Sequence, residues 1–586
     1  MHDAKTLQVK PRDYRISRLL FARIWRLTRP FWIQKSHLRW WVLMVALLAM
    51  APLSSWLFYK LSYLNADMTN AIVAKQRDEY TRLFWFVTLV TGMMWLAQMV
   101  MDFLSSRLNV IWRQWLTDWM IMRYLRNRTY YDIAVREDLD NPDQRIQEDI
   151  EPFVSTMAAI PRRILSQLMG LATGGVIIAS INPTMMWYVV GFAILSTIVT
   201  LVLYTPLIRL SFNSTVAEAD LRYGILHVRD NAETVAFYRG EKTEHQQIRH
   251  RLSTAVKARL AIILYQLKMG TLNYGLGQLW TLAPFFLIAP LFFDGKIEYG
   301  DIAMATTAAS QMLAALTTLT DFIPTVTDMA PSAVRLAQIL ERFDAMDEQQ
   351  HQADQNKIEI KPGKRIALND ISLETPGGEQ RLVRHLSLEV QPGRSLLIHG
   401  QTGVGKSSLL RAMAGLWQRG TGTITMPDKR DCFFLPQKPY MILSDLRSQL
   451  LYPHGDGSIS DAELQRYLER VSLPTLVDKY GGLDEVRDWA KVLSLGEQQR
   501  IGFARVLVAK PQYVFLDEAT SAVDIETEST LYCLLAEIGV TFISVGHRPS
   551  IMDYHADALC LYPSGQWDIK PITMLSQEEI GLIKTA

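Results

Sequence analysis

The stretch SLLIHGQTGVGKSSLLRA, residues 395–412, decides the fold of the C-terminal half of the chain. An apolar strand, residues 395–399, runs into a glycine-rich turn, and a helix follows at once. Glycines let consecutive backbone N–H groups point at a phosphate in front of the helix N-terminus. Because a strand and a helix both flank the turn, we predict a nucleotide-phosphate loop rather than a chance glycine-rich turn.

Two acidic residues after a second buried strand complete the predicted chemistry. Residues 513–516, YVFL, end in Asp517 and Glu518. Lys406 would reach the β- and γ-phosphates, Ser407 and Asp517 would bind Mg²⁺, and Glu518 would polarise the attacking water. The predicted ATP contacts of the loop are Gly400, Gln401, Thr402, Gly403, Val404, Gly405, Lys406, Ser407 and Ser408.

The composition of the two halves of the chain differs sharply. The chain has 586 residues, of which 49% are hydrophobic, and apolar runs crowd the first 330 or so. A formal net charge of +2 argues against bulk nucleic-acid binding. The three cysteines, Cys432, Cys533 and Cys560, form no CxxC pair, which argues against a disulfide framework or a zinc site.

Six apolar stretches are long enough to cross a bilayer, which takes roughly 20 residues. The first two lie at about residues 40–59 and 83–104. The third ends near residue 181, the fourth begins near 184 and the fifth ends near 293. The sixth lies at about 302–323. Residues 1–39 hold ten basic and two acidic residues, whereas residues 294–301 hold one basic and three acidic. The positive-inside rule therefore predicts a cytoplasmic N-terminus, and six crossings return the chain to the cytoplasm.

The connections between these stretches are unequal in length. Residues 105–160 and 206–260 are long and polar, with few glycines or prolines. Joined to their membrane segments they predict helices of about 40–50 residues, or ~60–75 Å at 1.5 Å per residue. Such helices extend well beyond a membrane, as a transporter that relays motion into the cytosol requires.

The predicted fold is an α-helical polytopic membrane domain of six transmembrane helices joined to an α/β P-loop ATPase domain. We expect a basic cytoplasmic segment at residues 1–39, the membrane domain at 40–340, a polar linker at 341–357 and the ATP-binding domain at 358–586.

Residues 493–500, LSLGEQQR, resemble the LSGGQ signature of the ABC ATPase family, with Leu495 where glycine is usual. The resemblance implies that Ser494 and Gly496 contact the γ-phosphate of a nucleotide held by the opposite subunit. It also implies a Q-loop at Gln437, which would be a further Mg²⁺ ligand, and a switch histidine at His547. The D-loop would lie at residues 521–524 and end in Asp524, a further residue of the nucleotide site. Glu518, Gln437 and His547 are then the candidate catalytic residues.

One position departs from the family pattern. Many members stack adenine on a tyrosine before the phosphate loop, and the corresponding place here is Thr375-Pro376. The preference for ATP over GTP is therefore left open.

Two further motifs, NPDQRI at residues 141–146 and NAETVAFYRG at residues 231–240, lie in the predicted cytoplasmic connections. Together with FLPQKPY at 434–440 and LRSQLLYP at 446–453 they resemble subfamily D, the peroxisomal fatty-acyl transporter group, and its bacterial YddA-like relatives. The membrane domain is similar to that of the peptide transporters SbmA and BacA. The residues alone predict a turn that leads into a short helix at Pro142, with a capped surface loop as the alternative.

Charged residues near the inner ends of the crossings either line a cavity or lie just below the membrane on the long helices. They are Asp102, Arg162, Arg163, Lys268 and Asp321.

The resemblance implies an exporter-type ABC half-transporter that hydrolyses ATP with Mg²⁺ and works as a homodimer by alternating access in the bacterial inner membrane. The expected partners are a second copy of the chain, the lipid bilayer and the substrate, and no nucleic acid. The candidate substrates are a fatty acid or acyl-CoA-like lipid, a peptide or a corrinoid. An ATP-gated regulator or channel without coupled transport is the alternative, while the six apolar stretches argue against a soluble ABC ATPase.

Overall fold

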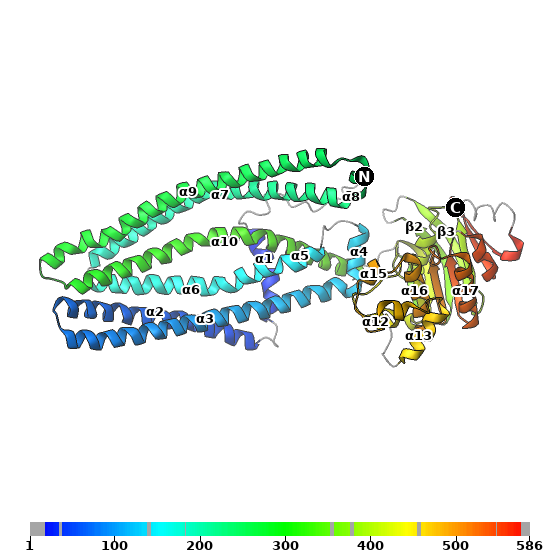
Figure 1. The fold of residues 1–586 in the computed structure, drawn as a ribbon, viewed down its shortest axis with the longest axis horizontal. Coiled ribbons are helices and arrows are strands. Elements are labelled where there is room, and N and C mark those ends of the chain that lie inside the picture. Colours follow the sequence, from blue (N-terminus) through cyan, green and yellow to red (C-terminus); the bar gives the residue numbers. More distant parts are fainter. Residues whose placement is uncertain are drawn as a thin grey trace. The chain divides into compact units, whose positions relative to one another are not determined.

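The computed structural model describes residues 18–33, 38–136, 142–181, 183–351, 357–375, 380–453, 459–546 and 548–575. The chain divides into two compact units, Met1–His351 and Gln352–Ala586 (Figure 1).

The first unit is helical. Its helices are α1 (Arg18–Ile33), α2 (Leu38–Val73), α3 (Arg77–Leu125), α4 (Thr129–Arg136), α5 (Pro142–Glu148), α6 (Ile150–Ile181), α7 (Pro183–Asp230), α8 (Ala232–Tyr238), α9 (Glu241–Phe293) and α10 (Tyr299–His351). Four of them are 48 to 53 residues long, namely α3, α7, α9 and α10. The expectation of very long helices is confirmed, because few residues in these stretches interrupt helical hydrogen bonding.

Several of these helices can cross a membrane. Among the described residues, four helices have the required length and apolar composition: Leu38–Val73, Arg77–Val135, Pro142–Ile181 and Glu241–Phe293. The other two predicted crossings fall in α7 and α10, several of whose side chains lie outside the described part. A membrane region with several apolar helices is thus present, and the count of six stays a prediction.

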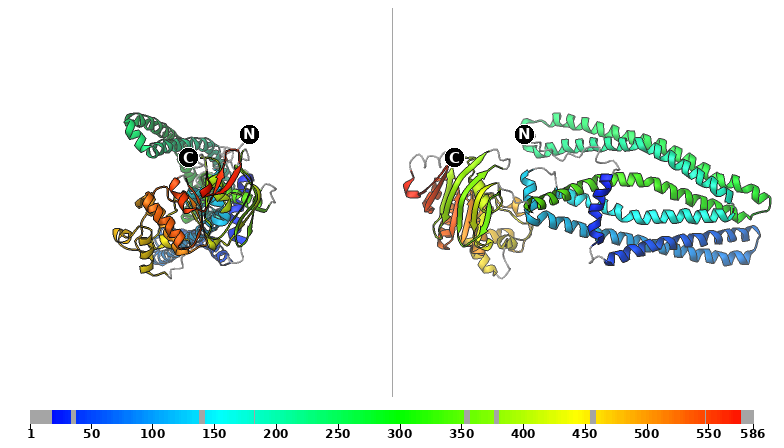
Figure 2. Two further views of the ribbon diagram at one scale, coloured as in Figure 1. Left: turned by 90° about the vertical axis from the view of Figure 1, so that its right-hand side faces the viewer. Right: turned by 180° about the vertical axis from the view of Figure 1, so that it is seen from behind.

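The long helices pack in pairs, with α2 along α3, α6 along α10 and α7 along α9 (Figures 1 and 2). A small residue permits one of these contacts. A Cβ atom at Gly174 on α6 would lie 3.0 Å from the Ala308 carbonyl oxygen of α10 and would also meet the Met312 side chain. Glycine therefore lets the two backbones approach, as small residues do between membrane helices.

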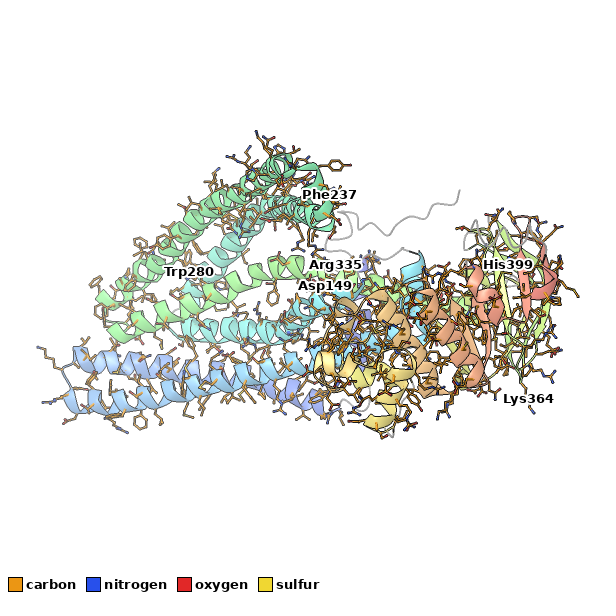
Figure 3. All side chains as sticks on the ribbon, turned by 45° about the vertical axis from the view of Figure 1, so that its right-hand side comes forward. Asp149, Phe237, Trp280, Arg335, Lys364 and His399 are labelled. Carbon is orange, nitrogen blue, oxygen red and sulfur yellow. The ribbon has the colours of Figure 1, made fainter. Side chains whose placement is uncertain are left out.

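An ion pair with one buried partner joins the residue before α6 to α10. The Asp149 side chain is only 3% exposed and pairs with Arg335, and Ser332 Oγ donates to Asp149 Oδ1 at 3.0 Å (Figure 3). Arg145 on the neighbouring α5 donates to Gln338 Oε1 at 3.2 Å. The short helix α5 is thereby held against α10.

The predicted charges at the membrane segments are partly paired. Asp102 on α3 lies 3.4 Å from Arg162 on α6, so the two charges join neighbouring helices. Arg163 and Lys268 are exposed, and the side chain of Asp321 lies outside the described part. A cavity-lining role for these residues stays a prediction.

Helix α10 runs through most of the stretch expected to be a linker at residues 341–357. It continues to His351, and residues 352–356 lie outside the described part. The polar side chains of this stretch make ion pairs: Glu341 with Arg23 at 2.9 Å, and Asp344 with Arg26 and Arg123. A polar composition without glycine or proline is compatible with a helix whose charges are paired.

The second unit contains two sheets. One has the order β1-β5-β2-β3 and the other β10-β9-β4-β8-β7-β6. The strands are β1 (Glu359–Pro362), β2 (Ile366–Glu374), β3 (Arg381–Val390), β4 (Leu396–Gly400), β5 (Gly420–Met426), β6 (Cys432–Leu435), β7 (Tyr513–Asp517), β8 (Thr541–Val545), β9 (Asp557–Leu561) and β10 (Trp567–Pro571). The helices are α11 (Lys406–Met413), α12 (Leu446–Leu451), α13 (Asp461–Arg470), α14 (Leu476–Tyr480), α15 (Trp489–Val492), α16 (Leu495–Ala509) and α17 (Ile525–Glu537).

Strands β4, β8, β7 and β6 pair in parallel. Their carboxyl ends therefore meet at one edge of the sheet, where ligands of open α/β sheets bind. The loop after β4, the acidic pair at the end of β7 and the segment after β6 all start from this edge. The predicted fold class, a helical membrane region joined to an α/β ATPase domain, is confirmed.

Candidate nucleotide-binding site

The phosphate loop runs from the end of β4 at Gly400 to the start of α11 at Lys406. Gly400 and Gly405 have φ angles of +145° and +101°, which residues with a side chain rarely adopt. A Cβ at Gly405 would also lie 3.0 Å from Leu382 Cβ on β3. Glycine is thus required for both the turn and its close contact with β3.

Lys406 is the first residue of α11, at the end of this loop, and is 6% exposed. Its Nζ donates to the carbonyl oxygens of Gly400 at 2.7 Å and Gln401 at 3.0 Å. Burial lowers the pKa of Lys406, and the negative charges of Glu518 and Asp517 oppose that shift. Phosphate oxygens can replace the two carbonyl acceptors and satisfy the ammonium group more fully.

Two of the three predicted Mg²⁺ ligands, Ser407 and Asp517, are adjacent. Ser407 Oγ donates to Asp517 Oδ1 at 2.8 Å, which joins α11 to the end of β7. A hydroxyl and a carboxylate oxygen suit Mg²⁺, which keeps several waters and takes its other ligands from nucleotide phosphates. The donor set therefore fits the ion predicted here.

Glu518 follows Asp517 in a left-handed conformation, with φ of +50°. Its N–H donates to the Val545 carbonyl at 2.9 Å, and its Oε2 accepts from Gln437 Nε2 at 2.8 Å. Strained backbone of this kind is concentrated at functional sites. The structure thus brings together two of the three predicted catalytic residues, while His547 lies outside the described residues.

Ser494 is the N-cap of α16 and forms a reciprocal pair with Glu497. Ser494 Oγ accepts from Glu497 N at 3.2 Å, and Glu497 Oε2 accepts from Ser494 N at 2.8 Å. Leu495, the departure from the usual glycine, is 39% exposed, so its side chain fits without displacing neighbours. A Cβ at Gly496 would lie 2.7 Å from the Ala522 carbonyl, so a glycine is needed there for the D-loop to pass.

Gln499 is a structural residue that the sequence analysis missed. It is 1% exposed, and its Nε2 donates to the Gln437 carbonyl at 2.8 Å and to Ser521 Oγ at 3.1 Å. Its Oε1 accepts from Ala522 N at 3.0 Å. One amide thus links the signature helix, the Q-loop and the D-loop. Two adjacent glutamines near the start of the helix were the available signal.

Asp524 serves as the N-cap of α17. Its carboxylate accepts from the N–H and the Oγ1 of Thr527, both at 2.8 Å. These hydrogen bonds, that from the backbone first, hold the pKa of Asp524 below its usual range. Its predicted part in nucleotide binding stays a prediction.

Thr375 directly follows β2 and bonds to Gln380, which directly precedes β3. Its N–H donates to the Gln380 carbonyl at 2.9 Å, and its Oγ1 accepts from Gln380 N at 3.2 Å. Leu382, next along β3, packs against Gly405 of the phosphate loop. Thr375 therefore lies beside the start of β3, the strand that borders the phosphate loop.

Thr375→Tyr is expected to tighten ATP binding about fivefold, because base–aromatic stacking contributes about 1–3 kcal/mol. Equilibrium binding of ATP to the purified full chain measures the change. Thr375→Val is the control, since it removes the hydroxyl without adding a ring. Unchanged or weaker binding in the tyrosine variant would show that adenine is held elsewhere.

Two family models match the chain. Residues 30–293 match ABC transporter transmembrane region 2, and residues 383–521 match the ABC transporter model. The chain belongs to the ABC transporter family. The ABC ATPase domain and the helical membrane region make it an ATP-hydrolysing, multi-pass membrane transporter.

Relatives of this ABC transporter share both of its units. An uncharacterized ABC transporter ATP-binding protein of Synechocystis is 39% identical over 92% of this chain and 83% of its own length. ABC transporter D family member 2, chloroplastic, of Arabidopsis thaliana is 29% identical over 93% and 87%. The lysosomal cobalamin transporter ABCD4 of Homo sapiens is 30% identical over 94% and 96%. The resemblance to D-type half-transporters is therefore confirmed.

Proposed function

We propose that this ABC transporter works as a homodimer that moves its substrate across the bacterial inner membrane by alternating access, with the N-terminus and the ATPase domain in the cytoplasm. The observation that carries the proposal is the junction of α11, β7 and the Q-loop. Ser407 bonds Asp517 there, and Gln437 bonds Glu518. Such a cluster of Mg²⁺-type donors beside a carboxylate base suits phosphoryl transfer to water.

Each residue has a role in this scheme. Lys406 and the loop amides bind the ATP phosphates, and Ser407, Asp517 and Gln437 would hold Mg²⁺. When bound, the ion supplies charge neutralisation at the phosphate oxygens. Glu518 accepts the proton of the attacking water, with His547 beside the γ-phosphate.

The signature residues complete the site from a second copy of the chain. Ser494 begins a helix, and the N-terminus of a helix favours an anion. Gly496 and Asp524 belong to segments that meet at the D-loop. Two copies related by a two-fold axis would complete two equivalent ATP sites, because such an interface uses the same surface of both subunits.

We further propose that the short helices α5 and α8 transmit motion between the ATPase and membrane domains. Helix α8 carries Phe237 and Tyr238, whose exposed fractions are 78% and 83% (Figure 3). Exposed aromatic side chains on a short helix are typical anchors for a docking partner. Helix α5 is tied to α10 through Arg145, so movement at its surface would reach a long helix directly.

An apolar hollow between α6, α7 and α10 supports a lipid-like substrate. Its lining is Leu171, Ala172, Gly175, Val176, Ala179, Met186, Val190, Ile194, Met312 and Leu316. A surface without charged or hydrogen-bonding side chains suits an acyl chain better than a peptide. The cobalamin named for the human relative keeps a corrinoid as the competing substrate class.

Transport by the purified full chain in liposomes tests this function. We expect fatty acids or acyl-CoAs to stimulate ATP hydrolysis more than peptides or corrinoids do, and flux to require hydrolysable ATP. Stimulation by corrinoids alone would overturn the substrate class. Equal flux with a non-hydrolysable ATP analogue would favour the ATP-gated channel instead.

A further inference from the structure

Helix α1 has one face buried in the bundle and one face exposed. Leu27 and Phe31 are completely buried, and they belong to the same core as the long helices. Phe21, Trp25 and Ile33 have exposed fractions of 58%, 62% and 59%. The exposed face thus presents large apolar side chains that the described part of the chain leaves uncovered.

The same helix is strongly basic. It contains four arginines and no acidic residue. Arg23 and Arg26 pair with acidic side chains of α10. Arg18 and Arg29 are exposed, and no ion pair joins either of them to another described residue. Two cationic groups are therefore available on the outer surface.

The free arginines and the apolar side chains lie on one stripe. The positions Arg18, Trp25, Arg29 and Ile33 are separated by seven, four and four residues, and this spacing keeps them on a single helix face. A hollow on this face is lined by Trp25, Arg26, Arg29, Pro30 and Ile33. Cationic and apolar groups thus share one small surface.

Helix α1 lies across the long helices, near the start of α2 (Figures 1 and 2). The Trp41 indole of α2 donates to the Trp32 carbonyl of α1 at 2.9 Å, which joins the two helices. Since α2 is one of the apolar helices suited to cross a membrane, a helix transverse to it at its end would lie along the membrane surface. The exposed stripe is then continuous with the lipid-facing surface.

We propose that the outer face of α1 is a binding site for anionic phospholipids. The guanidinium groups of Arg18 and Arg29 would bind headgroup phosphates in a bidentate manner. Trp25 would lie at the headgroup level, where tryptophan is enriched, and Phe21 and Ile33 would enter the acyl boundary. The positive charges of the two arginines favour an anionic lipid, since the choline cation of a zwitterionic headgroup offsets the negative charge of its phosphate.

The alternative occupant, a second copy of α1, is disfavoured by charge. A facing α1 would bring arginines against arginines, because the helix has no acidic residue. An anionic bilayer surface attracts basic residues at a membrane boundary, each contributing about 1 kcal/mol.

Lipid retention by the detergent-purified full chain tests the site, with bound lipids counted by native mass spectrometry. We expect wild-type protein to retain phosphatidylglycerol in preference to phosphatidylcholine. The variant R18Q/R29Q should lose about 25-fold in phosphatidylglycerol affinity, since each arginine contributes a factor of about five. R18K/R29K should keep most of it. R222Q/R249Q, which neutralises two exposed arginines of α7 and α9, is the matched control and should behave as wild type.

Two further measurements distinguish the loss of a lipid site from a folding defect. Basal ATP hydrolysis should be unchanged in R18Q/R29Q, because α1 contributes no residue to the ATP site. In the wild type alone, the preference for phosphatidylglycerol should fall as salt rises, because salt screens surface charges. Equal retention of both lipids by wild type, undiminished phosphatidylglycerol binding by R18Q/R29Q, or equal competition by soluble glycerol phosphate would overturn the proposal. Loss of dimers with unchanged lipid binding would assign the face to a protein contact instead.

Discussion

Replacing Glu518 with glutamine is expected to lower ATP turnover at least about a hundredfold, because a positioned general base contributes about 10²–10⁴-fold. The amide keeps the size of the carboxylate but cannot accept the proton of the attacking water. ATP binding should persist, since Lys406 and the phosphate loop are untouched. Steady-state phosphate release and equilibrium ATP binding of the purified full chain measure the two effects.

Glu518→Gln replaces the acceptor of one hydrogen bond, which Gln437 donates to Glu518 Oε2 at 2.8 Å. Glutamine offers an oxygen at the same place, so the Q-loop can keep its position. Glu526→Gln is the control, because Glu526 is an exposed acid in the first turn of α17. If Glu518→Gln hydrolyses ATP at a near-normal rate, the assignment of the base is wrong.

The second large effect is expected at α8. Removing both aromatic rings with Phe237→Ala and Tyr238→Ala should abolish transport and substrate stimulation, while basal ATP hydrolysis stays within about twofold. Aromatic anchors that dock in a pocket contribute about 2 kcal/mol or more each, so their joint loss should uncouple the two domains. Liposome transport and ATPase stimulation, measured on the same preparation, separate coupling from catalysis.

Tyr223→Ala is the matched control, because Tyr223 is an exposed aromatic residue of α7, 63% exposed, outside the α8 segment. A companion variant at the other short helix is Asp143→Arg, which inverts an exposed charge and leaves Arg145 bonded to α10. Asp78→Arg, in the first turn of α3, is its control. Normal transport by the Phe237 and Tyr238 double variant would refute the coupling role, since surface changes elsewhere cost only about 0.5 kcal/mol.

Local patterns were sufficient to predict the phosphate loop and the long helices. A run of apolar residues, three glycines and a lysine specify a strand, a turn and a helix within a short stretch, so neighbours in sequence decide the outcome. The same holds for α3, α7, α9 and α10, whose length follows from the small number of interrupting residues. Ser407 and Asp517 were both assigned to Mg²⁺ from their motifs, and the structure brings them together because parallel strand ends share one edge of the sheet.

Such local patterns could not predict the polar contacts between segments that are distant in the sequence. Gln499 became recognisable as the link from the signature helix to the Q-loop and the D-loop only when α16 packed against the D-loop. Residues 341–357 were expected to be a linker because the stretch is polar, and only the structure shows that α10 continues to His351 with paired acidic side chains.

Taken by itself, the sequence determined the strand–loop–helix of the ATP site, the acidic pair after β7 and the helical character of the membrane half, because each depends on residues close together in the chain. Only the tertiary structure decided that Glu341 meets Arg23 from a position 318 residues away, and that α1 keeps Arg18 and Arg29 on its outer face. The physical reason is that such contacts arise from packing between helices, which no local pattern of residues encodes.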